Sequence, residues 1–393
     1  MNNVKTGLDR LADNTCTIDL KGKDVGLISN QTGVSKDLRS GYEVLRSSGA
    51  SVKYLFGPEH GFTGDLREGG VVGDTEDEGS NTPIIGLYKD GFDPPRKSTI
   101  AELDTLIYDI QDLAVRCYTY VYTMIEMMDI AAEAGTEFLI FDRPPPLSGK
   151  KYDGSVIKGE LSSFIGGYGL PMIYGLTPGE LGKYVSSEYE FDIDPQVVRM
   201  EGWSRHLWYD ETDLLWVAPS PGIPHFETAL IYPATVLFEA TNVSEGRGTT
   251  KPFQYFGAPW IRSAELTDRV EELKEGGLIK GFDLRRCSFI PRFSKYEGEQ
   301  CHGCEIFVRN RDQFSPFRLG LSLLKLLRDL YPGEFEWYNG DLDRDISYFD
   351  RLAGSVKYRE LIDEGSSFDR LLEYSSKGLR EFSSTVEDYF LYT

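Results

Sequence analysis

The chain of 393 residues is 40% hydrophobic and 27% charged, a composition typical of a folded, soluble protein with a sizeable core. Its formal net charge of −21 argues against nucleic acid or an anionic membrane surface as a partner, because such binding requires clustered Lys and Arg. The length exceeds that of one average domain, so we expect two domains.

Residues 1–13 contain no apolar segment of the secretory type, and no run of about 18 apolar residues follows anywhere in the chain. The sequence therefore predicts no membrane insertion and a cytoplasmic location for the chain as it stands. An exported mature form that has lost a leader would look the same. No feature of the sequence fixes the oligomeric state.

The first half alternates short apolar strands with helical segments. We expect strands at residues 24–29, 51–56, 103–110 and 137–141, and helices at residues 38–48 and 118–134. Glycines follow both helices, at Gly49 and Gly135, where a helix commonly stops. This alternation predicts an α/β fold, a Rossmann-like parallel sheet with helices on both faces.

Polar residues follow each expected strand. They are Asn30 and Gln31, Glu59 and His60, Asp109 and Asp112, and Asp142 and Arg143. Since open parallel sheets bind ligands beyond the carboxyl ends of their strands, we expect a site at this edge. Single occurrences of such residues are ordinary turn chemistry, but four in series favour a site.

No GxGxxG follows the first strand and no GxxxxGK[ST] occurs, so the sequence predicts neither a dinucleotide nor a nucleotide cofactor. The acidic, glycine-rich residues 64–81 come directly after the Glu59 segment and predict a long exposed loop. Two readings of this loop stay open: a lid over a site, or a solvated excursion.

The second half begins beyond the polar run at residues 241–250. We place the domain boundary near residue 250, with a Rossmann-like catalytic domain at 1–250 and a smaller α+β domain at 251–393. A strand is expected at residues 305–308 and helices at residues 317–330 and 368–382. The motif Cys301-His302-Gly303-Cys304 has no second ligand pair for zinc, so we expect buried or incidental thiols and no metal site.

Glycosidic bonds are usually broken by two carboxyl groups, one of which protonates the leaving oxygen. Glu59, in Gly57-Pro58-Glu59-His60-Gly61, suits that role because it follows the strand expected at residues 51–56, at the edge of the sheet where we expect the site. His60 is a candidate to orient Glu59, contact a sugar or move a proton, and equally a candidate for a structural hydrogen bond.

The second carboxyl group has four candidates: Asp109, Asp112, Asp142 and Glu245. Asp112 is followed by Arg116 and Tyr118, donors that suit a carboxylate or an oxyanion, or else an ion pair beside buried tyrosines. Glu245 and Arg247 lie in Ser-Glu-Gly-Arg-Gly, a pattern typical of a ligand loop and also of a tight turn.

Several segments together resemble the exo-β-N-acetylmuramidases, formerly a domain of unknown function. They are GLISNQTG (26–33), FGPEHGF (56–62), YDIQDLAVRCYTYVYT (108–123), FDRPPPLSG (141–149), GLTPGELGKY (175–184), APSPGIPHFETALIYPATVLFEATNVSEGRGTTKPFQYFGAPWI (218–261) and CHGCEIFV (301–308). The resemblance implies release of terminal β-linked N-acetylmuramic acid from the non-reducing end of peptidoglycan fragments, without metal or organic cofactor. It also implies a site in the cleft between a Rossmann-like domain and a smaller one.

The resemblance places the catalytic glutamate at Glu59. We expect four catalytic residues, which are Glu59, His60, Asp112 and Glu245. The residues expected to bind the substrate are Asn30, Arg116, Tyr118, Asp142, Arg143 and Arg247. The lactyl carboxylate of muramic acid gives Arg116 or Arg247 a task, since a guanidinium holds a carboxylate through two hydrogen bonds. Thr63, Pro145 and Ala240 replace the Arg, Asn and Gly of the family pattern, so a related amino sugar stays open as substrate.

Two other functions remain as alternatives. One is a non-catalytic sugar-binding protein that keeps the fold. The other is a metal-dependent hydrolase that uses the carboxylates at the strand ends.

Overall fold

The computed structural model describes residues 2–89, 91–338 and 346–393. Seven strands form the larger sheet: β1 (Asp24–Ser29), β2 (Ser51–Gly57), β3 (Thr75–Glu76), β4 (Pro83–Gly86), β5 (Thr105–Asp109), β6 (Glu137–Phe141) and β7 (Gln196–Val198). Their order is β3-β4-β2-β1-β5-β6-β7, and every pairing is parallel except that of β3 with β4. Without the short β3, this is the doubly wound Rossmann order, which reverses direction between β1 and β5.

Helices cover both faces of this sheet, as the sequence predicted. The helices are α1 (Gly7–Ala12), α2 (Gly41–Ser47), α3 (Lys97–Ile100), α4 (Tyr120–Ala134) and α5 (Pro178–Glu188). Successive strand residues point to opposite faces, so Leu27 packs in one core with α1 and α2 while Ile28 packs in another with α3, α4 and α5. Helix α4 ends at Gly135, whose φ of 72° is the left-handed conformation expected of a terminating glycine.

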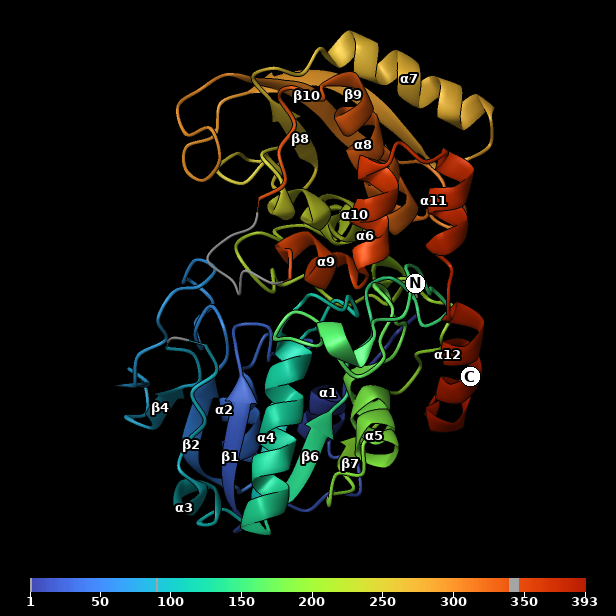
Figure 1. Cartoon of the computed structure of the whole chain (residues 1–393). Coiled ribbons are helices and arrows are strands. Elements are labelled where there is room, and N and C mark those ends of the chain that lie inside the picture. The colour runs from blue at the N-terminus through green and yellow to red at the C-terminus, as the bar shows by residue number, and fades with distance from the viewer. Residues whose placement is uncertain (1, 90, 339–345) are drawn as a thin grey trace.

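A second, antiparallel sheet has the order β8-β10-β9 and lies beyond the carboxyl ends of the larger sheet's strands (Figure 1). Its strands are β8 (Tyr255–Ala258), β9 (Phe282–Phe289) and β10 (Cys301–Val308). The helices that follow β7 are α6 (Phe226–Thr235), α7 (Ser263–Glu275), α8 (Pro316–Leu330), α9 (Tyr348–Ala353), α10 (Val356–Asp363), α11 (Phe368–Tyr374) and α12 (Leu379–Val386). Short 3-10 turns occupy Gly159–Leu161 (η1), Tyr209–Glu211 (η2), Val236–Ala240 (η3) and Glu387–Tyr389 (η4). The smaller unit is thus α+β.

The structure corrects one predicted helix. Residues 368–382 were expected to form a single helix, but α11 ends at Tyr374 and α12 begins at Leu379. Gly378 lies between them with a φ of 83°, a left-handed conformation that a continuous helix does not allow.

The packing of α6 bears on how the two halves join. This helix packs on α8, and a Cβ on Gly320 would lie 2.4 Å from the carbonyl oxygen of Ala234, so only glycine permits the approach. Residues on both sides of position 250 therefore share one core, and the boundary at that position stays a prediction. None of the helices in the described part of the chain is long and apolar enough to span a membrane.

Candidate active site

A cavity of about 590 Å³ lies where the carboxyl edge of the larger sheet meets the second unit. Its size falls within the range of roughly 300–1,000 Å³ that is usual for small-molecule sites. One side comes from the loop after β2 and from the residues that lead into α4. The other side comes from α6, η3 and the residue 245–253 segment.

Glu59 projects into this cavity from the loop that follows β2. The hydroxyl of Thr119 donates a hydrogen bond of 2.5 Å to its Oε2, and the amide of Gly69 lies 3.5 Å from its Oε1. Thr119 is the residue before the first turn of α4, and its side chain holds Glu59 instead of capping its own helix. A sugar-cleaving carboxyl group needs such a fixed position at the cavity wall.

His60 also lines the cavity, in a turn where its φ is 69°. Its Nδ1 lies 2.7 Å from the carbonyl oxygen of Leu66. Because a carbonyl oxygen only accepts, Nδ1 carries the hydrogen, and in the neutral ring Nε2 is the free acceptor. The sequence left two roles open for His60, and this geometry accommodates both a structural bond at Nδ1 and chemistry at Nε2.

Tyrosines and one phenylalanine form an aromatic wall. Tyr118 contacts Tyr120 and Tyr232 edge to face, with ring centroids 5.0 and 5.9 Å apart, and Tyr232 contacts Phe253 at 4.8 Å. The buried Tyr118 hydroxyl makes no hydrogen bond of regular geometry within the described residues, although Ser220 lies close by. The Tyr118 hydroxyl therefore lies on the cavity wall beside polar neighbours, Ser220 and Tyr120, with no firm bond to either.

The opposite wall carries a cluster of charges around Arg247. Its Nη2 lies 2.8 Å from Glu239, its Nη1 3.1 Å from Glu68 and its Nε 3.5 Å from Glu245. Burial alone would lower the pKa of Arg247, but the three carboxylates outweigh it and raise the pKa, so the guanidinium stays charged. Glu245, which is almost fully buried, also accepts a 3.0 Å bond from Lys295.

The glycines of the Ser-Glu-Gly-Arg-Gly segment permit this arrangement. Gly246 and Gly248 have φ of 79° and 77°, and a Cβ on either would clash with backbone atoms. The sequence predicted a ligand loop or a tight turn here. The segment is a tight turn whose Glu245 and Arg247 both reach the cavity.

Five predicted site residues do not line this cavity. They are Asn30, Asp112, Arg116, Asp142 and Arg143. The structure therefore corrects the expectation that all strand exits converge on one ligand. At three strand ends, those of β1, β5 and β6, the polar side chains form hydrogen bonds within the protein instead.

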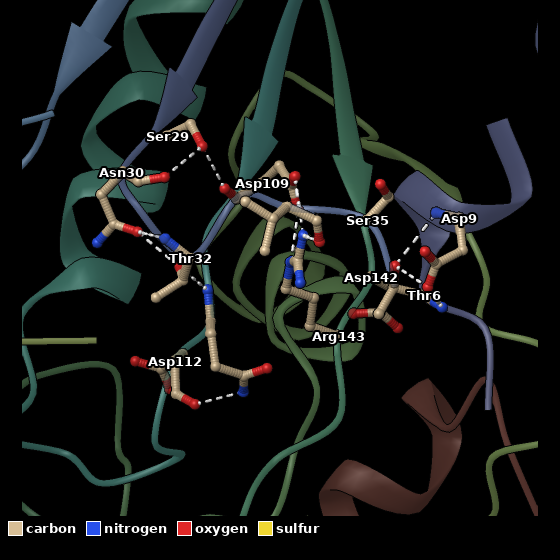
Figure 2. A network of polar contacts seen from close by, with 12 residues as sticks. Thr6, Asp9, Ser29, Asn30, Thr32, Ser35, Asp109, Asp112, Asp142 and Arg143 are labelled. Carbon is tan, nitrogen blue, oxygen red and sulfur yellow. Dashed lines mark hydrogen bonds and ion pairs between the residues drawn. The ribbon is translucent and has the colours of Figure 1, made fainter. Parts of the chain in front are cut away.

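The exits of β1, β5 and β6 are joined by the polar network of Figure 2. Arg143 donates to both carboxylate oxygens of Asp109, at 2.5 and 3.0 Å, and to the carbonyl oxygen of Val34. Asn30 accepts bonds from the amide and hydroxyl of Thr32, at 2.9 and 2.6 Å. The space left beside Thr32 and Arg143 is about 20 Å³, enough for a single water and not for a sugar.

Asp112 and Asp142 are both buried and hydrogen-bonded within the protein. Asp112 accepts from the Tyr174 hydroxyl and the Ala114 amide, each at 2.6 Å, and burial raises its pKa to about 6. Asp142 accepts from Tyr392, Thr177 and Gly179, and burial raises its pKa to about 7. These contacts tie loops together and leave neither carboxyl group facing the cavity.

Arg116 is fully buried and meets no carboxylate in the part of the chain that the structure describes. It donates to the carbonyl oxygens of Ser155 and Leu170, both at 3.1 Å, and to that of Leu352 in α9 at 3.0 Å. It therefore joins the Rossmann-like unit to the helical part of the second unit. Of the two arginines considered for the lactyl carboxylate, only Arg247 reaches the cavity.

The polar residues of the cavity that were not singled out from the sequence include Thr119, Glu239, Lys295 and Glu68. Thr119 lies within the YDIQDLAVRCYTYVYT segment and Glu239 lies shortly before Glu245, so both fell within motifs that had drawn attention. Lys295 comes from a loop that carries no pattern of its own, and Glu68 belongs to the acidic residues 64–81, for which a lid over a site was one of two interpretations.

Cys301 and Cys304, the two cysteines of the CxxC motif, are buried in the structure. All five cysteines are free, and burial raises the pKa of Cys301 and Cys304 to about 12, which keeps both as thiols. Within residues 2–89, 91–338 and 346–393, no group of three or more His, Cys, Asp or Glu side chains is arranged to hold a metal ion.

Comparisons with known proteins agree on one family. Residues 25–227 match the N-terminal model of the exo-β-N-acetylmuramidase NamZ, and residues 230–392 match its C-terminal model. The chain is 40% identical to the peptidoglycan β-N-acetylmuramidase NamZ of Bacillus subtilis (strain 168) over 390 residues, which cover 99% of this chain and 91% of that protein.

Two crystal structures of DUF1343 family proteins from Bacteroides fragilis NCTC 9343 share the fold. One is 31% identical with a TM-score of 0.88, and the match covers 100% of both chains. The other is 26% identical with a TM-score of 0.77, and the match covers 99% of both chains. The matches extend over both halves of the structure and include the loops that build the cavity, so the chain belongs to the NamZ family of exo-β-N-acetylmuramidases.

Proposed function

We propose that this protein is an exo-acting glycosidase that removes terminal β-linked N-acetylmuramic acid from the non-reducing end of peptidoglycan fragments, with Glu59 as its catalytic acid. The observation that carries the proposal is the Glu59 carboxyl group, fixed by Thr119 on the wall of a sugar-sized cavity. The family supplies the substrate class, since its Bacillus subtilis member is named for this activity.

Glu59 protonates the oxygen that leaves the anomeric carbon. His60, with its free Nε2, is the neighbouring group suited to take a proton from the attacking water. Glu239 and Glu245 are engaged by Arg247, and Glu245 also by Lys295, so they act as charge partners rather than as bases. Protons thus move between Glu59, His60, water and the two sugars, and no oxidant or reductant is needed.

The lactyl carboxylate of the substrate binds Arg247 by taking the place of Glu68. Among the three glutamates around Arg247, the Glu68 side chain is 46% exposed, against 21% for Glu239 and 2% for Glu245. Glu68 belongs to the acidic loop after the catalytic segment, so it is the partner that can leave at the lowest cost. A neutral amino sugar offers no anion for this exchange.

Glu59→Gln tests the proposal, with an aryl β-N-acetylmuramide as chromogenic substrate. We expect kcat to fall by about 10²–10⁴-fold, the usual contribution of a general acid, with unchanged thermal unfolding. Full activity in this variant would remove Glu59 from the mechanism. Glu78→Gln, an exposed change in the acidic loop that follows the Glu59 segment, is the control and should keep normal activity.

Two further measurements separate the alternatives. A sugar-binding protein without catalysis would bind muramic acid in calorimetry and release no product from the wild-type mixture over hours. A screen of related aryl amino sugars, followed by NMR of the first anomer released, defines the sugar and whether the reaction retains or inverts configuration.

A further inference from the structure

A second pocket of about 650 Å³ adjoins the catalytic cavity and has no role in the mechanism described above. The two spaces share Phe164, which lines both of them. Phe164 stands in a tight turn in which Ser163 and Gly166 exchange backbone hydrogen bonds of 2.7 and 3.0 Å. The turn is therefore the partition between the two spaces.

The second pocket is lined mainly by aromatic rings. They are Tyr88, Phe92, Tyr122, Phe164, Tyr168 and Tyr189. Phe164 and Tyr189 are 43% and 42% exposed, and both therefore present ring surface to solvent. Exposed aromatic surface on a concave wall is typical of a ligand site rather than of a folding core.

The base of the pocket is rigid. The hydroxyl of Tyr88 is 2.7 Å from that of Thr123, and the hydroxyl of Tyr122 donates a 2.8 Å bond to the carbonyl oxygen of Arg116. The Gly167 amide also donates to Tyr122, at 3.2 Å. With their polar ends fixed, these rings keep their orientation whether or not a ligand is present, which lowers the cost of ordering on binding.

Tyr88 packs edge to face against Phe164, the residue shared by the two spaces, with ring centroids 5.5 Å apart. Burial raises the pKa of Tyr88 strongly, the Thr123 hydroxyl opposes this, and the negative charges of Glu59 and Glu126 add to the rise. Tyr88 therefore responds to the charge of Glu59, which lines the catalytic cavity, and to that of Glu126, which lines the second pocket.

The charge of the lining limits the ligand. Among the described residues that line the second pocket none is Lys, Arg or His, and Glu126 carries the one carboxyl group. A muramic acid unit would bring its carboxylate toward Glu126, without a cation to meet it. An N-acetylglucosamine unit has no charge and offers a flat sugar face and hydroxyl groups that match rings and serine hydroxyls.

We propose that this aromatic pocket is a leaving-group subsite, which binds the uncharged amino-sugar unit on the reducing-end side of the bond that is cleaved. The proposal rests on the glycosidase function proposed above. An exo-acting enzyme holds the terminal sugar beside Glu59, and the rest of the fragment has to leave the cavity past one of its walls. The Phe164 turn is a wall with an aromatic pocket behind it, so the chain of sugars continues over Phe164.

Tyr189→Ala tests the proposal, because Tyr189 lines the second pocket and not the catalytic cavity. The two substrates are an aryl β-N-acetylmuramide, whose leaving group is not a sugar, and a muramic acid–N-acetylglucosamine disaccharide or longer fragment. We expect kcat/KM for the fragment to fall by about five- to tenfold, the size expected for one aromatic contact, and the value for the aryl substrate to change by less than about twofold. Tyr189→Phe should restore the fragment activity.

Two controls complete the design. Phe307→Ala removes an exposed aromatic ring that lines neither space and should leave both activities unchanged. Ser162→Trp, at an exposed position on the pocket lining, fills the pocket without removing a ring and should lower fragment activity selectively. This second variant decides the matter if Tyr189→Ala does not fold.

Equal losses on both substrates, or no selective loss in Tyr189→Ala and Ser162→Trp, would overturn the subsite. A wild-type protein that releases no muramic acid from either substrate would instead overturn the proposed function. The two failures are therefore distinct.

Discussion

Replacing Glu68 with Gln should tighten the binding of muramic acid. In the structure the Glu68 carboxylate lies 3.1 Å from Nη1 of Arg247, where the lactyl carboxylate of the substrate is proposed to bind. The substrate must displace Glu68 before it forms its own pair with the guanidinium. Removal of the competing charge leaves Arg247 with two glutamates, and its remaining donors become free for the ligand.

The magnitude follows from the exposure of the pair. The Glu68 side chain is 46% exposed and that of Arg247 is 17% exposed, so solvent screens the pair in part. Exposed ion pairs contribute about 0.2–1 kcal/mol, and a pair with one largely buried partner belongs at the upper end, about 1 kcal/mol. That energy corresponds to a roughly fivefold lower inhibition constant for N-acetylmuramic acid.

The assay is competitive inhibition of aryl muramide hydrolysis by N-acetylmuramic acid and by N-acetylglucosamine. Only the first inhibitor carries the lactyl group, so only its inhibition constant should fall in Glu68→Gln, and the gain should shrink at high salt. Glu78→Gln removes the same charge from the same loop and should change neither constant. Weaker binding of both sugars to Glu68→Gln would refute the reasoning, because Glu68 would then contact the substrate itself.

Three further predictions concern positioning and stability. Thr119→Val removes the hydrogen bond to Glu59 and should lower kcat by about tenfold with little change in KM, while Thr119→Ser should restore it, as steady-state kinetics will show. Arg205→Met leaves the buried Glu180 without the two 2.7 Å bonds from Arg205. The free energy of unfolding, measured by urea titration, should fall by about 3–5 kcal/mol. Unchanged stability would contradict this account. Burial raises the pKa of Asp142 to about 7, above the value of about 3.9 in an unfolded chain. Its protonated form therefore stabilises the fold. This contribution is fully present below about pH 4 and is lost as the pH rises through 7. In Asp142→Asn the Tm measured by calorimetry should therefore fall less between pH 4 and 7 than in the wild type, and equal slopes would exclude Asp142 as the source.

The sheet was predictable because each strand and helix carried its own local signal. Apolar runs such as Asp24–Ser29 and Glu137–Phe141 match β1 and β6 residue for residue, and Gly135 ends α4 as expected. The single helix predicted across Gly378 was wrong. The sequence pattern around a glycine in an apolar segment is the same whether the helix continues through the glycine or ends there.

The site was predictable only in part. Polar residues at strand exits look alike in sequence whether they face a ligand or one another. The Arg143–Asp109 pair and the Asn30–Thr32 contacts fill the edge where β1 and β5 diverge, so the open space lies instead beside β2 and α4. Thr119 and Glu68 could not be identified because their roles depend on contacts with residues 60 and 179 positions away, which no local pattern encodes.

The buried guanidinium of Arg116 determines which parts of the protein are free to move. It bonds to carbonyl oxygens of both units, and a Cβ on Gly354 would lie 2.6 Å from its Nη2, so the interface is tightly closed around a charge that meets no carboxylate among the described residues. A hinge motion that parted the two units would break the bond from Arg116 to Leu352, and a hydrogen bond from a charged group contributes about 1.5–3 kcal/mol. We therefore expect slow amide exchange at the Leu352 end of α9 and fast exchange in the acidic loop around Glu68. Turnover in this fold would then be gated by a loop and not by domain closure.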